Sequence, residues 1–174
     1  MRKTLLLCLL TAAAVSAADG VPETVDPAQI PHYKKISPTL AAAGQPSAEA
    51  LPKLGALGFK TVINLRMPTE DQPADERAIV EGQGLRYVAV PFTSSSLSQA
   101  DVDAVAKVLD DPASGPVLLH CARSVRVGAM WSLIQLRKGK TLEEALAAGR
   151  EAGNKSPALE EAVRRLAAPA PRAP

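Results

Sequence analysis

The segment Val117–Val127, with the sequence VLLHCARSVRV, is the most informative part of the 174-residue chain. Its apolar first part ends at His120 and Cys121, Arg126 follows, and an apolar helical pattern comes next. This order predicts a buried strand, a tight loop and a helix. The first N–H groups of a helix have no carbonyl partner, and together with the helix dipole they attract anions. A thiol beside an arginine at such a place ionises more readily than a free cysteine and becomes a nucleophile. We therefore expect a cysteine-based anion site at residues 121–126.

The first 17 residues have the features of a secretory signal peptide. Arg2 and Lys3 precede an apolar, uncharged run over residues 5–15, which is too short to span a bilayer. Val15-Ser16-Ala17 then supplies small residues at the two positions that determine cleavage. We expect cleavage after Ala17, export to the periplasm or the medium, and no membrane attachment of the mature chain.

Removal of the signal peptide changes the charge and the cysteine content of the chain. The full sequence has 20 Lys and Arg against 18 Asp and Glu, and the loss of Arg2 and Lys3 makes the two numbers equal. A neutral chain gives no indication of binding to nucleic acid or to an anionic membrane. Cys121 becomes the single cysteine, and unpaired thiols are unusual in exported proteins. Its position after a strand end favours a reactive thiol over a buried structural one.

The mature chain of 157 residues has the size of one domain with a hydrophobic core. We expect a lead-in over residues 18–32, a single domain over 33–167 and an Ala/Pro tail over 168–174. With two histidines and one mature cysteine, the sequence offers no metal cluster, so we expect neither a metal nor another cofactor.

Predicted strands alternate with predicted helices, which is typical of an α/β fold with a mostly parallel central sheet of four to five strands flanked by helices. The expected strands cover residues 33–40, 60–65, 86–90 and 117–119, and the expected helices cover 47–57, 75–81, 98–109, 127–138, 141–152 and 157–166. Pro52 fits poorly inside the first of these helices. In such folds the functional loops follow the C-terminal ends of the strands, so loops 66–74, 91–97 and 121–126 are expected at one edge.

Four motifs occur in order along the chain: Ala43–Ser47 (AGQPS), Gly58–Arg66 (GFKTVINLR), Gly84–Tyr87 (GLRY) and His120–Gly128 (HCARSVRVG). Together they resemble the cysteine phosphatase superfamily, and most closely its small bacterial phosphatase-like domains, also called beta-lactamase-hydrolase-like. The resemblance covers most of the mature chain. It implies the same α/β fold and a phosphorylated or other small anionic substrate.

The resemblance also implies a mechanism. Cys121 would attack phosphorus and form a thiophosphate intermediate, while Arg126 would hold the oxygens of the anion and stabilise the charge of the transition state. His120 would fix the loop and support the thiolate rather than transfer protons. The backbone N–H groups that complete the anion site would come from Ala122, Arg123, Ser124, Val125 and Arg126.

The loop departs from the pattern of the larger tyrosine phosphatases in two ways. Four residues separate Cys121 from Arg126 where those enzymes have five, and rhodanese-type sulfurtransferases share the shorter spacing, which the small bacterial branch also tolerates. The expected glycine of the loop is Ser124. Glycine serves where φ is positive or the backbone approaches a ligand, so a serine is expected to strain the loop by about 1–2 kcal/mol or to force another conformation.

The general acid of these phosphatases usually comes from the loop after the preceding strand, but loop 91–97 (PFTSSSL) has no carboxylate. Glu70 and Asp71 lie on the expected edge and are candidates for the acid or for a second anion contact. Arg66 either assists anion binding or pairs with Glu70. Without a general acid, whose contribution is typically 10²–10⁴-fold, hydrolysis would favour substrates with good leaving groups.

Three functions remain open from the sequence. The first is an exported cysteine-dependent phosphatase-like hydrolase. The second is sulfur transfer through a persulfide on Cys121, which the short loop and the missing acid favour. The third is a non-catalytic anion-binding domain, which Ser124 and the acid-poor loop favour.

Overall fold

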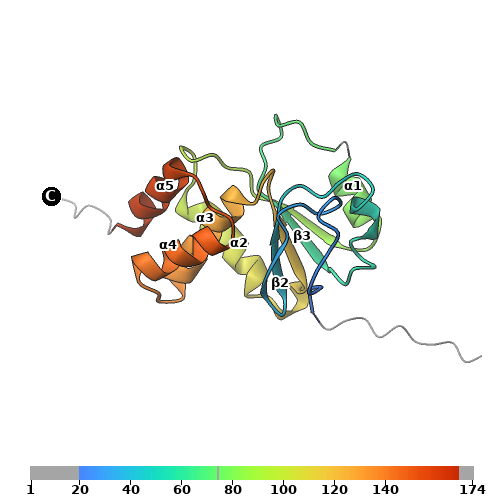
Figure 1. Ribbon diagram of the computed structural model, residues 1–174, viewed down its shortest axis with the longest axis horizontal. Coiled ribbons are helices and arrows are strands. Elements are labelled where there is room, and N and C mark those ends of the chain that lie inside the picture. Colours follow the sequence, from blue (N-terminus) through green and yellow to red (C-terminus); the bar gives the residue numbers. More distant parts are fainter. Residues whose placement is uncertain (1–19, 74, 169–174) are drawn as a thin grey trace, which may run out of the picture.

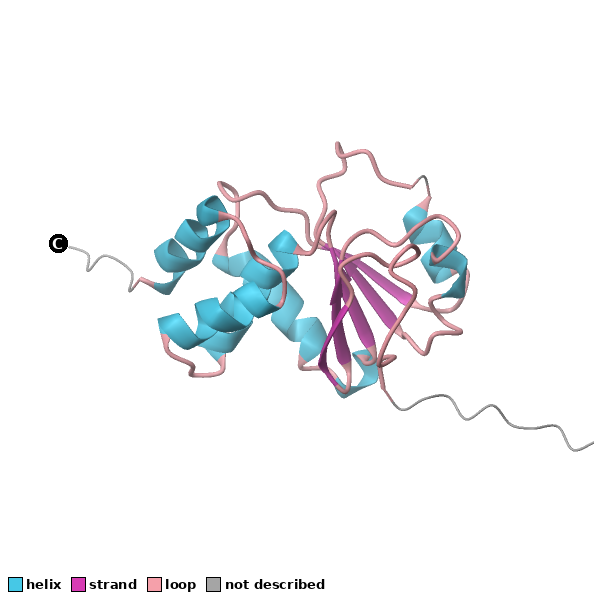
Figure 2. Cartoon of the chain, viewed as in Figure 1, coloured by secondary structure: helices cyan, strands magenta, loops and turns pink. Residues whose placement is uncertain are grey.

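The computed structural model describes residues 20–73 and 75–168. The predicted signal peptide and nearly all of the predicted Ala/Pro tail lie outside the described residues. At the centre of the described chain is a five-stranded sheet in the order β1-β2-β5-β3-β4 (Figure 2). The strands are β1 (Lys34–Ser37), β2 (Leu40–Ala43), β3 (Thr61–Asn64), β4 (Arg86–Ala89) and β5 (Val117–His120).

The sheet is parallel except for the edge strand β1, which runs antiparallel to β2. The segment VLLH forms the central strand β5, in which Leu118 pairs with Ala41 of β2 and Val62 of β3. All four residues of β5 are buried, as expected for a parallel strand covered on both faces. The predicted α/β fold is therefore confirmed, and the observed sheet has five strands.

Two sequence predictions near the start of the domain were wrong in detail. The strand expected over residues 33–40 ends at Ser37, and a separate strand β2 follows whose sequence is LAAA. Alanine has low strand propensity and LAAA does not alternate, so β2 carried no pattern that predicts a strand. The helix expected over 47–57 is a single 3₁₀ turn, Leu51–Lys53, because Pro52 fits only the first turn of a helix.

The five α-helices in the described part of the chain begin and end close to the predicted positions. They are α1 (Glu76–Glu81), α2 (Gln99–Leu109), α3 (Val125–Arg137), α4 (Leu142–Glu151) and α5 (Pro157–Ala167). Ser98 with Asp101 and Thr141 with Glu144 form the two predicted capping boxes, which satisfy the first N–H groups of α2 and α4. A further 3₁₀ turn, Pro112–Ser114, precedes β5.

The helices divide unequally between the two faces of the sheet (Figure 1). α2, α3, α4 and α5 gather on one side, whereas α1 and the 3₁₀ turn at Leu51–Lys53 cover the other. Each side has its own apolar cluster: Leu119 and Met130 belong to the first, and Leu118 and Phe59 to the second. None of the helices in the described part of the chain is both long and apolar enough to cross a membrane.

The register of the sheet brings the ends of three strands together. His120 at the end of β5 pairs with Asn64 at the end of β3 and with Ala43 at the end of β2. The chain segments that follow these residues therefore start at one edge. This edge is where the predicted anion site lies, between the end of β5 and the start of α3.

Candidate active site

The loop from Cys121 to Ser124 joins the end of β5 to the first turn of α3. It is held from one side by the segment after β2, because the N–H of Gln45 donates to the carbonyl of Ala122 at 3.2 Å. The first N–H groups of α3, at Val125 and Arg126, have no hydrogen-bond acceptor among the described residues. Unpaired N–H groups at the start of a 13-residue helix are suited to hold an anion.

Ser124 adopts the left-handed conformation, with φ of 61° and ψ of −1°. The serine therefore takes the conformation for which glycine is preferred, and the expected strain is present rather than an altered loop. The side chain is buried, and its hydroxyl donates to the carbonyl of Ala152 at 2.9 Å. This hydrogen bond joins the loop to the end of α4 and offsets part of the strain. Gly153, with φ of 118°, faces Ser124 so closely that an added Cβ would lie 2.9 Å from the Cβ of the serine.

Arg126 forms a two-pronged ion pair with Glu70, with N–O distances of 2.5 and 2.7 Å. The guanidinium also donates to the carbonyl of Phe92 at 3.3 Å. These contacts bring together loops 121–126, 66–74 and 91–97, as predicted from the order of the strands. Burial disfavours the charged guanidinium, but the Glu70 hydrogen bond and the charges of Cys121 and Glu70 outweigh it and raise the pKa of Arg126.

Glu70 is fully ionised in this geometry. The hydrogen bond from Arg126 is the main cause, and it lowers the pKa of Glu70 from 4.5 to about 2 despite partial burial. The N–H of Met67 and Nε of Arg66 also donate to this carboxylate, at 2.7 and 3.3 Å. A carboxylate of such low pKa holds no proton to donate near neutral pH, so the geometry disfavours Glu70 as the general acid.

Arg66 is 8% exposed and lies inside the site. One of its N–H groups donates to the side-chain oxygen of Gln45 at 2.7 Å, and another donates to the carbonyl of Asp71. The structure thus realises the predicted pairing of Arg66 with Glu70, at 3.3 Å, and adds the contact with Gln45. Asp71 is exposed and touches Arg66 through its backbone, so its carboxylate is not part of the ion-pair cluster.

His120 is fully buried, and its Nε2 lies 2.8 Å from a carboxylate oxygen of Glu76. Burial opposes ionisation of Glu76, but hydrogen bonds and charge from His120 prevail and lower its pKa. The second oxygen of Glu76 accepts from Gln45 at 2.9 Å. Nδ1 of His120 has no partner among the described residues. The side chain of His120 is thus held against the start of α1, and its expected role as a support for the loop stays a prediction.

These contacts form one continuous polar chain beneath the loop. It runs, in order, through His120, Glu76, Gln45, Arg66, Glu70 and Arg126. No role for Glu76 was predicted from the sequence. A buried histidine at the end of an apolar strand needs a polar partner, and this requirement was the one indication in the sequence that His120 has such a partner.

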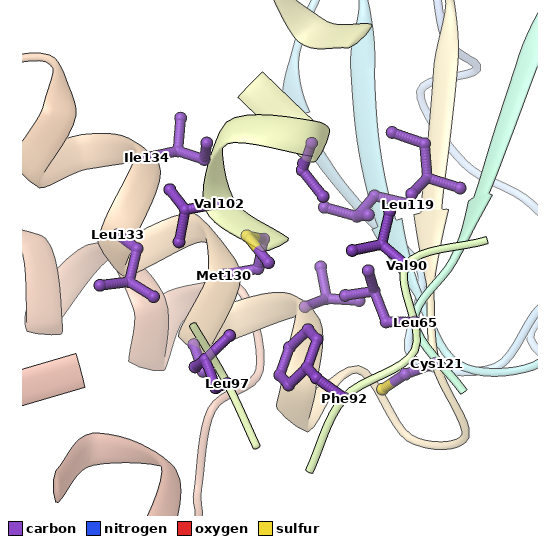
Figure 3. Packing of buried hydrophobic residues seen from close by; sticks show 14 of the residues in the cluster. Leu65, Val90, Phe92, Leu97, Val102, Leu119, Cys121, Met130, Leu133 and Ile134 are labelled. Carbon is purple, nitrogen blue, oxygen red and sulfur yellow. The ribbon is translucent and has the colours of Figure 1, made fainter. Parts of the chain in front are cut away.

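Cys121 is 1% exposed and unpaired. In Figure 3 its sulfur lies at the margin of the apolar cluster, with Phe92 and Leu65 as labelled neighbours. Phe92, from the loop that usually supplies the acid, is itself fully buried. Among residues 20–73 and 75–168, no three His, Cys, Asp or Glu side chains are arranged to hold a metal ion.

The structure has a buried cysteine after the central parallel strand, a short loop with a left-handed residue, and an arginine in the first turn of the next helix. This arrangement fits the class of cysteine-dependent phosphatases, which the comparison with protein families identifies. The chain belongs to a particular family of this class. The family model described as DSP-PTPase phosphatase fused to NAD⁺ kinase matches residues 27–165. Members of the class hydrolyse phosphoric monoesters.

Individual proteins are similar to the chain in sequence or in fold. The beta-lactamase hydrolase-like protein of Agrobacterium fabrum is 31% identical over 110 residues, which are 61% of this chain but 25% of that protein. The match thus spans about a quarter of the relative's length. A DUF442 protein of Shewanella putrefaciens has a similar structure, with a TM-score of 0.66 and 24% identity over 80% of this chain and 90% of that one. TpbA of P. aeruginosa, as a cysteine-to-serine variant in complex with pTyr, has a TM-score of 0.56 and 25% identity over 86% of this chain and 98% of that one.

The conformation of Ser124 leads to a testable ranking of two variants. Ser124→Ala and Ser124→Gly both lose the hydrogen bond to Ala152, but only alanine keeps a Cβ in the left-handed region. We expect Ser124→Ala to be less stable than Ser124→Gly by about 1 kcal/mol, measured by urea unfolding. An alanine variant as stable as the glycine variant would contradict a positive φ at this position.

The Arg126–Glu70 pair makes stability depend on pH. Because the pKa of Glu70 falls from 4.5 to about 2 on folding, its contribution is fully present above about pH 4.5 and is lost as the pH falls toward 2. The free energy of unfolding of the wild type should exceed that of Glu70→Gln at about pH 6, and the difference should shrink at about pH 3. The control is Glu81→Gln, which removes an exposed ion pair with Arg77. This pair should contribute less than about 1 kcal/mol to the free energy of unfolding. A difference that does not depend on pH would refute this assignment.

Proposed function

We propose that the protein hydrolyses phosphate monoesters through the thiolate of Cys121 and the anion site of residues 121–126. The observation that carries this proposal is the placement of Cys121 beside the Arg126 side chain, in the loop that leads to the unpaired N–H groups at the start of α3. A phosphate group bound there would have a nucleophile on one side and positive charge around its oxygens.

The reaction would proceed in two displacements at phosphorus. The sulfur of Cys121 forms a bond to phosphorus while the P–O bond to the leaving alcohol breaks, and the oxygen departs with the electron pair. Water then attacks phosphorus, the S–P bond breaks, and phosphate leaves as the thiolate is restored. In both steps the negative charge on the equatorial oxygens would be stabilised by Arg126 and the loop N–H groups.

The donors of Arg126 divide between protein and substrate. One terminal nitrogen donates to both Glu70 and Phe92, and the other uses one of its two N–H groups for Glu70. An arginine has five N–H donors, so Nε–H and one terminal N–H remain for an anion. Glu70 would therefore orient the guanidinium while leaving an edge of it for phosphate.

Leaving-group protonation is the weak step of this mechanism. Loop 91–97 has no carboxylate and Glu70 is ionised, which leaves Asp71 as the remaining acid candidate from the sequence. We infer that the protein prefers substrates whose leaving group departs without a proton, such as aryl phosphates. The complex of the P. aeruginosa TpbA variant with pTyr, an aryl phosphate, supports this inference.

Turnover of p-nitrophenyl phosphate by the mature protein tests the proposal. Cys121→Ser should lower kcat by about 10³-fold or more, because the hydroxyl replaces the nucleophilic thiolate. Ser132→Ala serves as the control and should keep most of the activity. It removes a buried hydroxyl of α3 that lies about two helical turns from the loop. Activity that survives Cys121→Ser would exclude the mechanism.

Sulfur transfer is the second candidate, favoured by the absence of a carboxylate from loop 91–97. It requires a persulfide on Cys121. The thiolate would form it by taking the outer sulfur of thiosulfate as sulfite leaves, and cyanide would remove that sulfur as thiocyanate and restore the thiolate. A mass increase of one sulfur atom on Cys121, together with no hydrolysis of aryl phosphate, would support it in place of the phosphatase.

We further propose that the protein is exported, on the basis of the features of residues 1–17. Expression of the full chain in a Gram-negative bacterium should yield periplasmic protein whose first residue is Ala18. Recovery in the cytoplasm with an intact N-terminus would contradict export.

A further inference from the structure

A cavity of about 790 Å³ lies beside the loop that joins β5 to α3. Three segments line it: residues 32–34 at the start of β1, residues 123–125 at the end of the loop and the start of α3, and residues 150–153 and 155–157, which run from the end of α4 to the start of α5. The last segment includes the start of α5 at Pro157. Residues 123–125 therefore belong both to the cavity lining and to the proposed phosphate site.

Hydrogen bonds hold all three walls in fixed positions relative to the loop. Ser124 binds the carbonyl of Ala152, and the N–H of Gly44, whose backbone pairs with Arg123, donates to the carbonyl of Pro31 at 2.7 Å. Nζ of Lys34 donates to the backbone carbonyl of Glu151 and so links the first wall with the third. The cavity is thus part of the same rigid assembly as the loop.

The cavity is positively charged. Lys34, Arg123 and Lys155 line it, and none of them forms an ion pair with a carboxylate of the described residues. Arg150 also lines it but is neutralised by Glu160, with N–O distances of 2.6 and 2.7 Å. The lining contains one carboxylate, that of Glu151.

The charge of the cavity beside Glu70 is different. This second cavity, of about 480 Å³, is lined by Arg66 and Arg77 and by four acidic residues, Glu70, Asp71, Asp75 and Glu76. Glu70 and Glu76 are paired with Arg66, Arg126 and His120, and Arg77 with Glu81, so the charges in this lining without an ion pair among the described residues are those of Asp71 and Asp75. An anionic group attached to a bound phosphate would be repelled from this side and attracted to the side of Arg123 and Lys155. The charge distribution therefore favours one orientation of a ligand that carries a second anionic group.

We propose that the basic cavity beside the loop, lined by Lys34, Arg123 and Lys155, binds a second anionic group of the substrate. The proposal rests on the proposed function and specifies its substrate class: small molecules that carry two or more phosphate groups. A volume near 790 Å³ suits a compact ligand, and cavities for small molecules usually measure about 300–1,000 Å³. The second phosphate would lie among exposed cations that need no rearrangement to receive it.

Binding measurements on full-length mature protein test this subsite without requiring turnover. The probes are inorganic tripolyphosphate and orthophosphate, titrated by calorimetry into Cys121→Ser protein and into the same protein carrying Lys155→Glu. We expect the charge reversal to weaken the binding of tripolyphosphate about tenfold and the binding of orthophosphate by less than about twofold, because only the longer anion reaches Lys155. Lys155→Ala should give an intermediate loss.

Lys107→Glu is the matched control, because Lys107 is an exposed lysine of α2 outside the cavity lining. It should leave both affinities within about twofold of the parent, and a rise in salt should reduce the advantage of tripolyphosphate.

Equal weakening of both anions by Lys155→Glu would show a general field effect and overturn the proposal, as would no weakening of either. A singly phosphorylated acidic peptide that binds more tightly than tripolyphosphate and depends on Lys155 would also overturn it, in favour of a peptide. These outcomes are independent of turnover. If p-nitrophenyl phosphate is not hydrolysed while tripolyphosphate still depends on Lys155, the proposed function fails and the subsite remains.

Discussion

Burial of polar and charged side chains at the C-terminal edge of the sheet is the constraint on which this site depends. His120 is fully buried and Arg66 is 8% exposed, and polar or charged groups so far from water are tolerated only when they are hydrogen-bonded. The side chains between them meet this condition in one unbroken chain, in which Glu76 and Glu70 supply the carboxylates. The arginine of the anion loop is the last member of that chain. Its orientation is therefore fixed by residues that would not themselves touch a substrate.

The backbone conformation of Ser124 also constrains the loop. Ser124 has a left-handed conformation that costs a non-glycine residue about 1–2 kcal/mol, and the hydrogen bond from its hydroxyl to the carbonyl of Ala152 offsets part of this cost. The same hydrogen bond fixes the segment after α4, and Gly153 is required there because a Cβ would meet Ser124. Anion loop, α4 and the basic cavity are thus parts of one packing arrangement. A change in any of them is expected to alter the other two.

Much of the fold could be predicted because local patterns and global topology agree. The apolar run of β5, the capping boxes of α2 and α4, and the alternation of strands and helices each indicate the same α/β arrangement. The prediction failed at β2, where LAAA shows no strand pattern and extended structure comes from pairing with β1 and β5. It failed again over residues 47–57, where the apolar spacing suggested a helix although Pro52 limits it to one turn.

The sequence by itself determined the position of the proposed nucleophile, Cys121, and of Arg126, since a strand end, a short loop and a helix start follow one another along the chain. It also determined that loop 91–97 has no acid, because this is a matter of composition. Only the tertiary structure decided what Glu70 does: its distance to Arg126, across 56 residues of sequence, holds its pKa at about 2. The same is true of Glu76 and of the cavity at Lys155, because contacts between distant segments depend on how the strands are ordered in the sheet and leave no local pattern in the sequence.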